Sequence, residues 1–101
     1  MLFRSFVRVL CDVYCDWQGP DPVYRVYVDN ELFTERTFSW PDCFLEEMIQ
    51  IEAEPGNYEI RYEVVSPGLV QLRTENMRVD FGPATAKGNI IRIREPEHAS
   101  L

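Results

Sequence analysis

The residues that most often carry catalysis are sparse in this sequence and poorly placed to act together. The 101-residue chain has a single histidine, His98, which lies in a polar terminal stretch. Glu46 and Glu47 are adjacent, so on a strand their carboxylates point to opposite faces. The serines lack a base partner and the Gly-flanked elbow of hydrolases, and the five glycines form no phosphate-binding loop. We therefore expect no catalytic residues, and we expect that the protein is not an enzyme.

The three cysteines, Cys11, Cys15 and Cys43, offer little disulfide or metal chemistry. An odd count favours free thiols in a reducing compartment. On a strand Cys11 and Cys15 share a face but lie about 13 Å apart, beyond the reach of a disulfide. Together with His98 they could form a metal site, but they lack the close cysteine pairs of zinc-binding motifs. We expect buried apolar thiols, with no metal and no cofactor.

Aromatic residues beside loops offer another kind of chemistry, the stacking of sugar rings. Trp17, Tyr27 and Trp40 flank predicted loops that also carry Asp and Asn side chains. The same acidic residues could supply oxygen ligands to calcium. The favoured interpretation is that both tryptophans close the ends of a small core, as large aromatic side chains often do. A carbohydrate-binding module remains the alternative function.

The charge balance argues against several classes of partner. Ten Lys and Arg face 17 Asp and Glu, which gives a net charge of −7. Nucleic-acid recognition needs a basic surface, so we expect no nucleic-acid partner. The chain has no apolar run of the roughly 18–20 residues that span a membrane, and residues 1–17 lack the features of a signal peptide. We expect no membrane partner, and synthesis in the cytoplasm without export.

Nine of the ten cationic residues are arginine, and only Lys87 is lysine. Arginine is enriched and lysine depleted where protein surfaces meet, because the planar guanidinium tolerates desolvation and binds carboxylates in pairs. A GC-rich genome produces the same bias. Both explanations stay open.

Apolar residues recur with a period of two in short segments separated by turn residues, a pattern typical of strands. Residues 44–53 also suit a helix by propensity, but the alternation of Leu45, Ile49 and Ile51 with polar residues favours a strand. Residues 82–88 are expected to form a loop. The expected strands are residues 6–14, 23–29, 32–40, 44–53, 58–65, 69–72, 77–81 and 89–94, with 69–81 alternatively one bent strand.

This spacing predicts a single all-β domain over residues 1–101. About seven or eight short strands, with turns every eight to twelve residues and no convincing helix, indicate an antiparallel β-sandwich of immunoglobulin-like or jelly-roll type. A small closed barrel is the alternative. Residues 95–101 are expected to form a polar C-terminal tail.

Two stretches carry a resemblance to a known group of proteins. The sequence VYRVYVDNELFTERTFSW at residues 23–40, followed by a strand and then EPGNYEIRYEVV at residues 54–65, resembles small β-sandwich virion proteins of tailed phages, notably the T4-like phages of cyanobacteria. The turn Pro55-Gly56-Asn57-Tyr58 is also similar to the entry into a late strand in immunoglobulin-like and carbohydrate-binding sandwiches. The resemblance covers residues 23–65.

The resemblance implies a virion structural protein, either a capsid decoration or cement subunit or a minor head or tail subunit. Its partners would be other virion proteins, such as major capsid or tail subunits, and it would form a homo-oligomer or bind to the virion lattice. It would be made in the host cytoplasm and located in the virion. Such modules bind through strand edges, loops and termini, so the expected interface residues are Leu2, Phe3, Arg4, Arg92, Arg94, Pro96 and Leu101.

Overall fold

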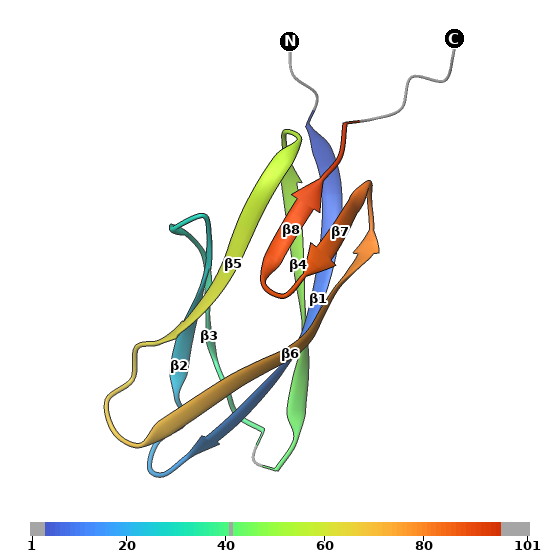
Figure 1. The fold of residues 1–101 in the computed structure, drawn as a ribbon. Helices are drawn as coiled ribbons and strands as arrows, with labels where there is room; N and C mark the ends of the chain where they lie inside the picture. Colours follow the sequence, from blue (N-terminus) through green and yellow to red (C-terminus); the bar gives the residue numbers. More distant parts are fainter. Residues whose placement is uncertain (1–3, 41, 96–101) are drawn as a thin grey trace, which may run out of the picture.

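The computed structural model describes residues 4–40 and 42–95, and within these ranges every regular element is a β-strand (Figure 1). The strands form two antiparallel sheets, one of three and one of five strands. The predicted β-sandwich is confirmed, and the barrel alternative is wrong because the sheets stay separate. The strands are β1 (Ser5–Trp17), β2 (Val23–Val28), β3 (Glu31–Thr37), β4 (Phe44–Ala53), β5 (Gly56–Val64), β6 (Val70–Phe81), β7 (Ala84–Lys87) and β8 (Ile90–Ile93).

The strand order favours the immunoglobulin-like form of the sandwich. The three-stranded sheet has the order β4-β1-β6, and the five-stranded sheet has the order β3-β2-β5-β8-β7. The pair β1–β4 and the run β3-β2-β5-β8 have the neighbours of strands B–E and C′-C-F-G in immunoglobulin domains. β6 departs from that scheme, because it follows β5 in the chain yet pairs with the outer side of β1.

The turn from β4 into β5 contains a tyrosine corner. The Tyr58 hydroxyl donates a hydrogen bond of 2.6 Å to the carbonyl oxygen of Glu54. Immunoglobulin-like sandwiches have a tyrosine in the same place, near the start of strand F, bonded to the backbone a few residues upstream. The Pro-Gly-x-Tyr turn singled out in the sequence therefore fixes the corner that leads from one sheet to the other.

The core is built around β1, the central strand of the three-stranded sheet. Its residues alternate between a buried inner face and an outer face, as the period of two requires. The inner residues of both sheets exclude water and supply the main driving force for folding. The buried set includes Val7, Val9, Cys11, Val13, Tyr24, Val26, Phe38, Ile49, Ile60, Ile91 and Ile93.

Two expectations about the C-terminal half are settled by the structure. Residues 70–81 form one strand, β6, as the alternative of a single bent strand predicts, and this strand carries an irregularity where Asn76 adopts a positive φ of 56°. The prediction of a loop over residues 82–88 was wrong, because β7 occupies Ala84–Lys87 and pairs with β8. β7 is only four residues long and contains two alanines, so it has a weak strand signal.

Gly82 lies in the turn between β6 and β7, where the backbone passes close to β1. A Cβ at this position would lie 2.5 Å from the Phe6 carbonyl oxygen and 3.0 Å from Val7 Cα, and the glycine has a φ of +109°. We expect Gly82→Ala to reduce the free energy of unfolding by about 2–3 kcal/mol, through steric overlap with β1 added to backbone strain. Gly68 is a matched control, because its φ is +102° but no atom lies within 4 Å of its Cβ position. Gly68→Ala should reduce the free energy of unfolding by only about 1 kcal/mol, as measured by urea unfolding. Equal losses of stability in the two variants would show that the close approach of Gly82 to β1 has no effect.

Candidate interaction surface

The outer face of the three-stranded sheet carries large apolar side chains where water-facing polar residues are the norm. An antiparallel sheet with one solvated face normally alternates apolar residues inside with polar residues outside. Here six outward positions are apolar, and four of them are 42% to 56% exposed. We call this surface the outer face, and its apolar residues are Phe6, Leu10 and Tyr14 of β1, Phe44 and Met48 of β4, and Phe81 of β6.

The strand register joins these side chains into one strip. Tyr14 lies opposite Phe44, and their rings stack with centroids 5.2 Å apart. At the other end of β1, the rings of Phe6 and Phe81 meet edge to face at 6.0 Å. Leu10 pairs with Met48 between these two aromatic clusters. Polar pairs separate these groups, Arg8–Gln50 on one side of Leu10 and Asp12–Glu46 on the other, so the strip consists of three apolar clusters in a row.

Arginines cover the aromatic ends of the strip. The guanidinium of Arg73 lies 4.4 Å from the centre of the Tyr14 ring, and that of Arg8 lies 5.7 Å from the centre of the Phe81 ring. Such cation–π contacts hold the guanidinium flat against the apolar surface. Aromatic residues, methionine and arginine are also the residue types enriched at protein–protein interfaces.

The charges on the outer face pair with one another. Arg78 bridges Asp12 at 3.2 Å and Glu46 at 2.5 Å. Arg8 pairs with Asp80, and Arg73 pairs with Glu75. At the ends of the face Glu52 pairs with Arg4, and Asp16 adds one more negative charge, so four arginines and six carboxylates sum to −2, whereas the whole chain carries −7. Exposed pairs add little stability, but they leave this surface close to electrically neutral.

A hollow lies at the Tyr14 end of the outer face. Its lining includes Tyr14, Phe44 and Arg73, together with Cys43 from the segment that leads into β4. Pockets of this kind beside aromatic and arginine side chains are where anchoring residues of a partner insert. The outer face therefore has the composition and the relief of a docking surface.

Three of the residues expected at the interface, all arginines, are described by the structure, and the other four are not. Leu2, Phe3, Pro96 and Leu101 are outside the described residues. Arg4 donates a hydrogen bond of 2.7 Å to the Glu52 carbonyl oxygen in the three-stranded sheet. Arg92 is exposed on β8 of the five-stranded sheet, and Arg94 follows that strand. Arg4 precedes β1 and Arg94 follows β8, and the start of β1 and the end of β8 lie at the same end of the sandwich (Figure 1), so an interface that includes these arginines stays a prediction.

The three aromatic residues proposed to stack on a sugar do not share a platform. Trp17 is half-buried, and both Trp17 and Trp40 pack edge to face on the buried Phe38, at 5.6 Å and 5.7 Å. Tyr27 lies on β2, where the guanidinium of Arg61 is 4.2 Å from its ring centre. Trp17 and Trp40 thus help to close one end of the core, as the favoured interpretation predicts.

A buried polar cluster lies between the two sheets. The Glu47 side chain on β4 is 1% exposed, although its neighbours on the inner face are apolar. It forms an ion pair with Arg36, and it accepts a hydrogen bond of 3.2 Å from the Tyr24 hydroxyl. The other Glu47 oxygen and the nearby Tyr62 hydroxyl are buried without a hydrogen-bond partner among the described residues. We interpret the cluster as structural, because the Glu47 carboxylate is closed off from solvent and only Arg36 reaches the surface.

Burial raises the pKa of Glu47, and the contacts with Tyr62, Arg36 and Tyr24 oppose the shift. A carboxyl group whose pKa is higher in the folded state than in the unfolded state stabilises the fold fully below its unfolded value, 4.5 here. This contribution is lost as the pH rises through the folded pKa.

We therefore expect the wild-type protein to lose stability relative to Glu47→Gln as the pH rises above 4.5, the unfolded value, and through the raised folded pKa. Glutamine keeps the size and hydrogen bonding of glutamate but does not titrate. Urea unfolding of both proteins across this pH range measures the effect. If the difference in stability between the two proteins does not change with pH, burial does not raise the pKa of Glu47.

The cysteines and the rest of the described chain suggest no other chemistry. Cys11 and Cys15 are buried, and Cys43 is exposed. Burial raises the pKa of both Cys11 and Cys15, which disfavours the reactive thiolates. Within residues 4–40 and 42–95, no group of three or more His, Cys, Asp or Glu side chains is placed to hold a metal ion. The same ranges contain no helix that could cross a membrane.

The sequence contains an indication of the outer face that the search for alternating apolar residues did not use. β1 has apolar residues on its inner face, at Val7, Val9 and Val13. It also has apolar residues on its outer face, at Phe6, Leu10 and Tyr14. A strand with apolar residues on both faces is expected to be covered on both faces. In the structure only one face of β1 packs against the second sheet.

Comparison with known proteins adds no family to this description. The sequence matches no family model, no curated protein matches it, and no solved structure matches the fold. The class of the protein is therefore defined by its own architecture, an antiparallel β-sandwich with one apolar, arginine-bordered outer face.

Proposed function

We propose that this protein is a non-enzymatic structural subunit that docks onto neighbouring protein subunits through the outer face. The observation that carries the proposal is the row of apolar clusters formed by Phe6, Leu10, Tyr14, Phe44, Met48 and Phe81, on a sheet face that no other layer of the described residues covers. Burying such a strip contributes about 25 cal/mol for each Å² of apolar area, against the cost of ordering two proteins.

A second copy of the same chain is the partner that this surface fits best. Two chains that each carry −7 repel one another over most of their surfaces. The outer face carries only a small net charge, so two copies can meet there without strong electrostatic repulsion. Closed two-fold assemblies bury the same patch of both subunits, which a flat sheet face allows.

The setting of this assembly follows from the resemblance to small virion proteins of tailed phages. In that setting the protein is a capsid decoration or cement subunit, or a minor head or tail subunit, and its other partners are neighbouring virion proteins. The acidic charge and the predominance of arginine agree with a subunit that binds protein and not nucleic acid. The carbohydrate-binding alternative is not supported further, because its three aromatic residues are dispersed.

Sedimentation equilibrium of the purified chain over a hundredfold concentration range tests the proposal. The buffer contains a reductant, because Cys43 is exposed and could form disulfide-linked dimers. We expect a reversible dimer or larger closed oligomer. A monomer at every concentration would overturn self-association through the outer face.

A further inference from the structure

The five-stranded sheet contains a stretch of open edge within the sandwich. β8 pairs with β5 only over residues 56–59 of β5, whereas β2 pairs with β5 as far as Val64. Past Ile90, where β8 begins, one side of β5 has no neighbouring strand among the described residues. Figure 1 shows the same feature, with β7 and β8 confined to one half of the sandwich and β5 and β6 diverging in the other half.

The backbone groups of this edge can be assigned from the printed hydrogen bonds. Asp29 donates to the Glu59 carbonyl, and Val65 donates to the Val23 carbonyl, so odd-numbered residues of β5 bond to β2. Ile60 instead donates to Asn89, on the β8 side. Because these directions alternate along an antiparallel strand, the N–H and C=O groups of Tyr62 and Val64 point to the open edge.

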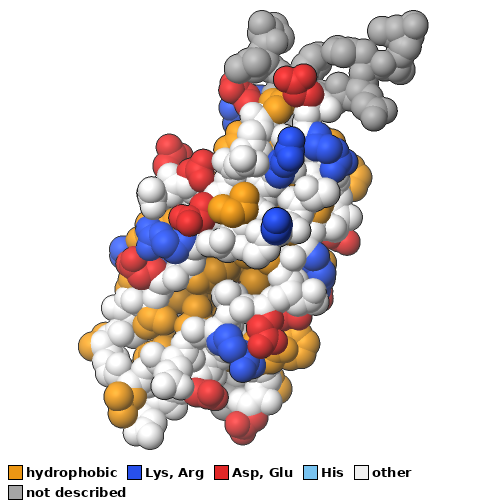
Figure 2. Space-filling view, viewed as in Figure 1, with side chains coloured by type: hydrophobic (Ala, Val, Ile, Leu, Met, Phe, Trp, Pro, Cys, Tyr) orange, Lys and Arg blue, Asp and Glu red, His pale blue; other side chains and the backbone are white. Residues whose placement is uncertain are grey.

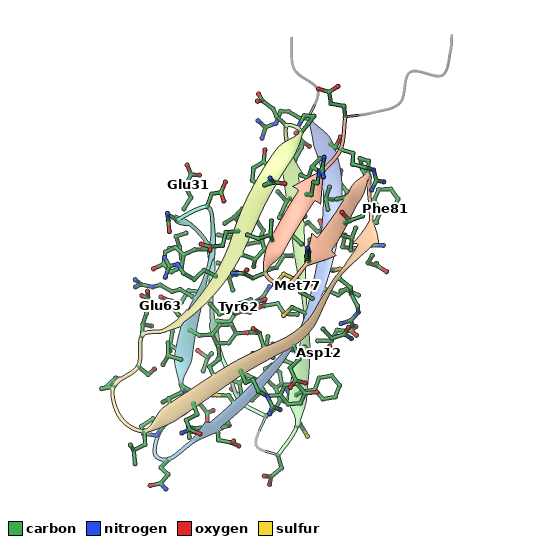
Figure 3. The ribbon with its side chains drawn as sticks, viewed as in Figure 1. Asp12, Glu31, Tyr62, Glu63, Met77 and Phe81 are labelled. Carbon is green, nitrogen blue, oxygen red and sulfur yellow. The ribbon has the colours of Figure 1, made fainter. Side chains whose placement is uncertain are left out.

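The side chains beside the open edge are apolar and only partly covered. Ile60, which lies beside the end of β8, is 1% exposed, but the next inward residues, Tyr62 and Val64, are half-buried. Leu72 and Met77 on β6 are also half-buried and pack against the core. Figure 3 shows Tyr62 and Met77 between the diverging β5 and β6, and Figure 2 shows hydrophobic side chains at the surface in this part of the view.

We propose that this site, which we call the β5–β6 seam, binds an extended polypeptide segment that adds to β5 as a strand in line with β8. The segment would come from a partner protein and would have an apolar side chain at every second position. Its backbone would bond to Tyr62 and Val64, and its apolar side chains would pack against the half-buried Tyr62, Leu72 and Met77. Main-chain bonds then provide affinity, and the alternate side chains provide specificity. The seam is distinct from the outer face, so the inference does not depend on the proposed function.

The probe is a blocked synthetic heptapeptide of alternating threonine and valine with a terminal lysine, titrated into the full ¹⁵N-labelled chain. We expect saturable changes in the amide signals of Tyr62, Val64, Leu72 and Met77, with a Kd below about 1 mM. The amides of Tyr62 and Val64 should also exchange with solvent more slowly when the peptide is bound. The control is the same peptide with N-methyl groups on the amides of one edge, which keeps the side chains but blocks pairing. It should bind at least about tenfold more weakly.

Two variants of β5 separate backbone pairing from side-chain contact. Val64→Pro removes the N–H that faces the open edge but leaves the bonds of β5 to β2, and proline is tolerated at such edge positions. It should weaken peptide binding at least about tenfold, whereas Val64→Ala, which keeps the N–H, should weaken it less than about threefold. The proposal is overturned if both peptides bind alike, if the changes map to β3 or β4, or if no saturable binding occurs up to several millimolar. The peptide comparison stands even where Val64→Pro fails to fold.

Discussion

Replacing Phe44 and Met48 with threonine is expected to weaken self-association about 100-fold or more, while the protein stays folded. Both side chains lie on the outer face of the edge strand β4, Phe44 beside Tyr14 and Met48 beside Leu10, and they are 51% and 46% exposed. Aromatic residues at the centre of an interface commonly lose more than 2 kcal/mol of binding free energy on truncation. Threonine keeps the preference for strand structure, so the fold itself should lose no more than about 1–2 kcal/mol. Sedimentation equilibrium gives the dissociation constant, and urea unfolding gives the stability.

A matched control lies in the other sheet. Leu32 and Phe33 on the edge strand β3 are 56% and 42% exposed, so Leu32→Thr/Phe33→Thr removes a comparable amount of exposed apolar surface. This variant should associate like the wild type. If both double variants lose association equally, non-specific hydrophobic contact explains the oligomer, and the outer face has no special role.

Removing the arginine that pairs with the buried carboxylate is expected to have the largest effect on stability of any polar substitution. Arg36→Ala leaves Glu47 with no cationic partner in a site that is closed to water. Breaking a buried ion pair from one side costs several kcal/mol, and we expect about 2–3 kcal/mol at neutral pH, because the Arg36 side chain itself is 43% exposed. The loss should shrink as the pH falls, because protonation of Glu47 removes the unpaired charge. Urea unfolding at several pH values measures it.

The double variant Arg36→Ala/Glu47→Gln separates this explanation from lost packing. With glutamine at position 47 no buried charge is left unpaired, so the double variant should recover most of the stability that Arg36→Ala loses at neutral pH. An equal loss in Arg36→Ala and in the double variant would mean that the Arg36 side chain acts through packing alone.

The sandwich could be predicted from the sequence because most strands have a clear period of two. Residues 44–53 were ambiguous by propensity, but Leu45, Ile49 and Ile51 recur at the strand period, and the structure has a strand with the same bounds. β7 could not be predicted, since its small residues carry no alternation. The pairing of β6 with β1 was also out of reach, because it joins segments more than 50 residues apart and depends on the irregularity at Asn76.

The candidate surface was harder to predict than the fold. Sequence reasoning placed interface residues at Arg4, Arg92, Arg94 and the terminal residues, whereas the outer face combines side chains from β1, β4 and β6. Which of these lie side by side is decided by the strand register, as with Tyr14 and Phe44. Glu47 shows the same limit, because it occupies a position that strand periodicity assigns to the apolar core.

Hydroxyl-radical footprinting at low and high protein concentration is the most direct test of the outer face. The account predicts that Phe6, Tyr14, Phe44, Met48 and Phe81 become protected from oxidation as the oligomer forms. Trp40 and Leu69, which are exposed outside this face, should react equally at both concentrations. Protection of Trp40 or Leu69 with no change at Phe44 and Met48 would contradict the assignment of the outer face as the docking surface.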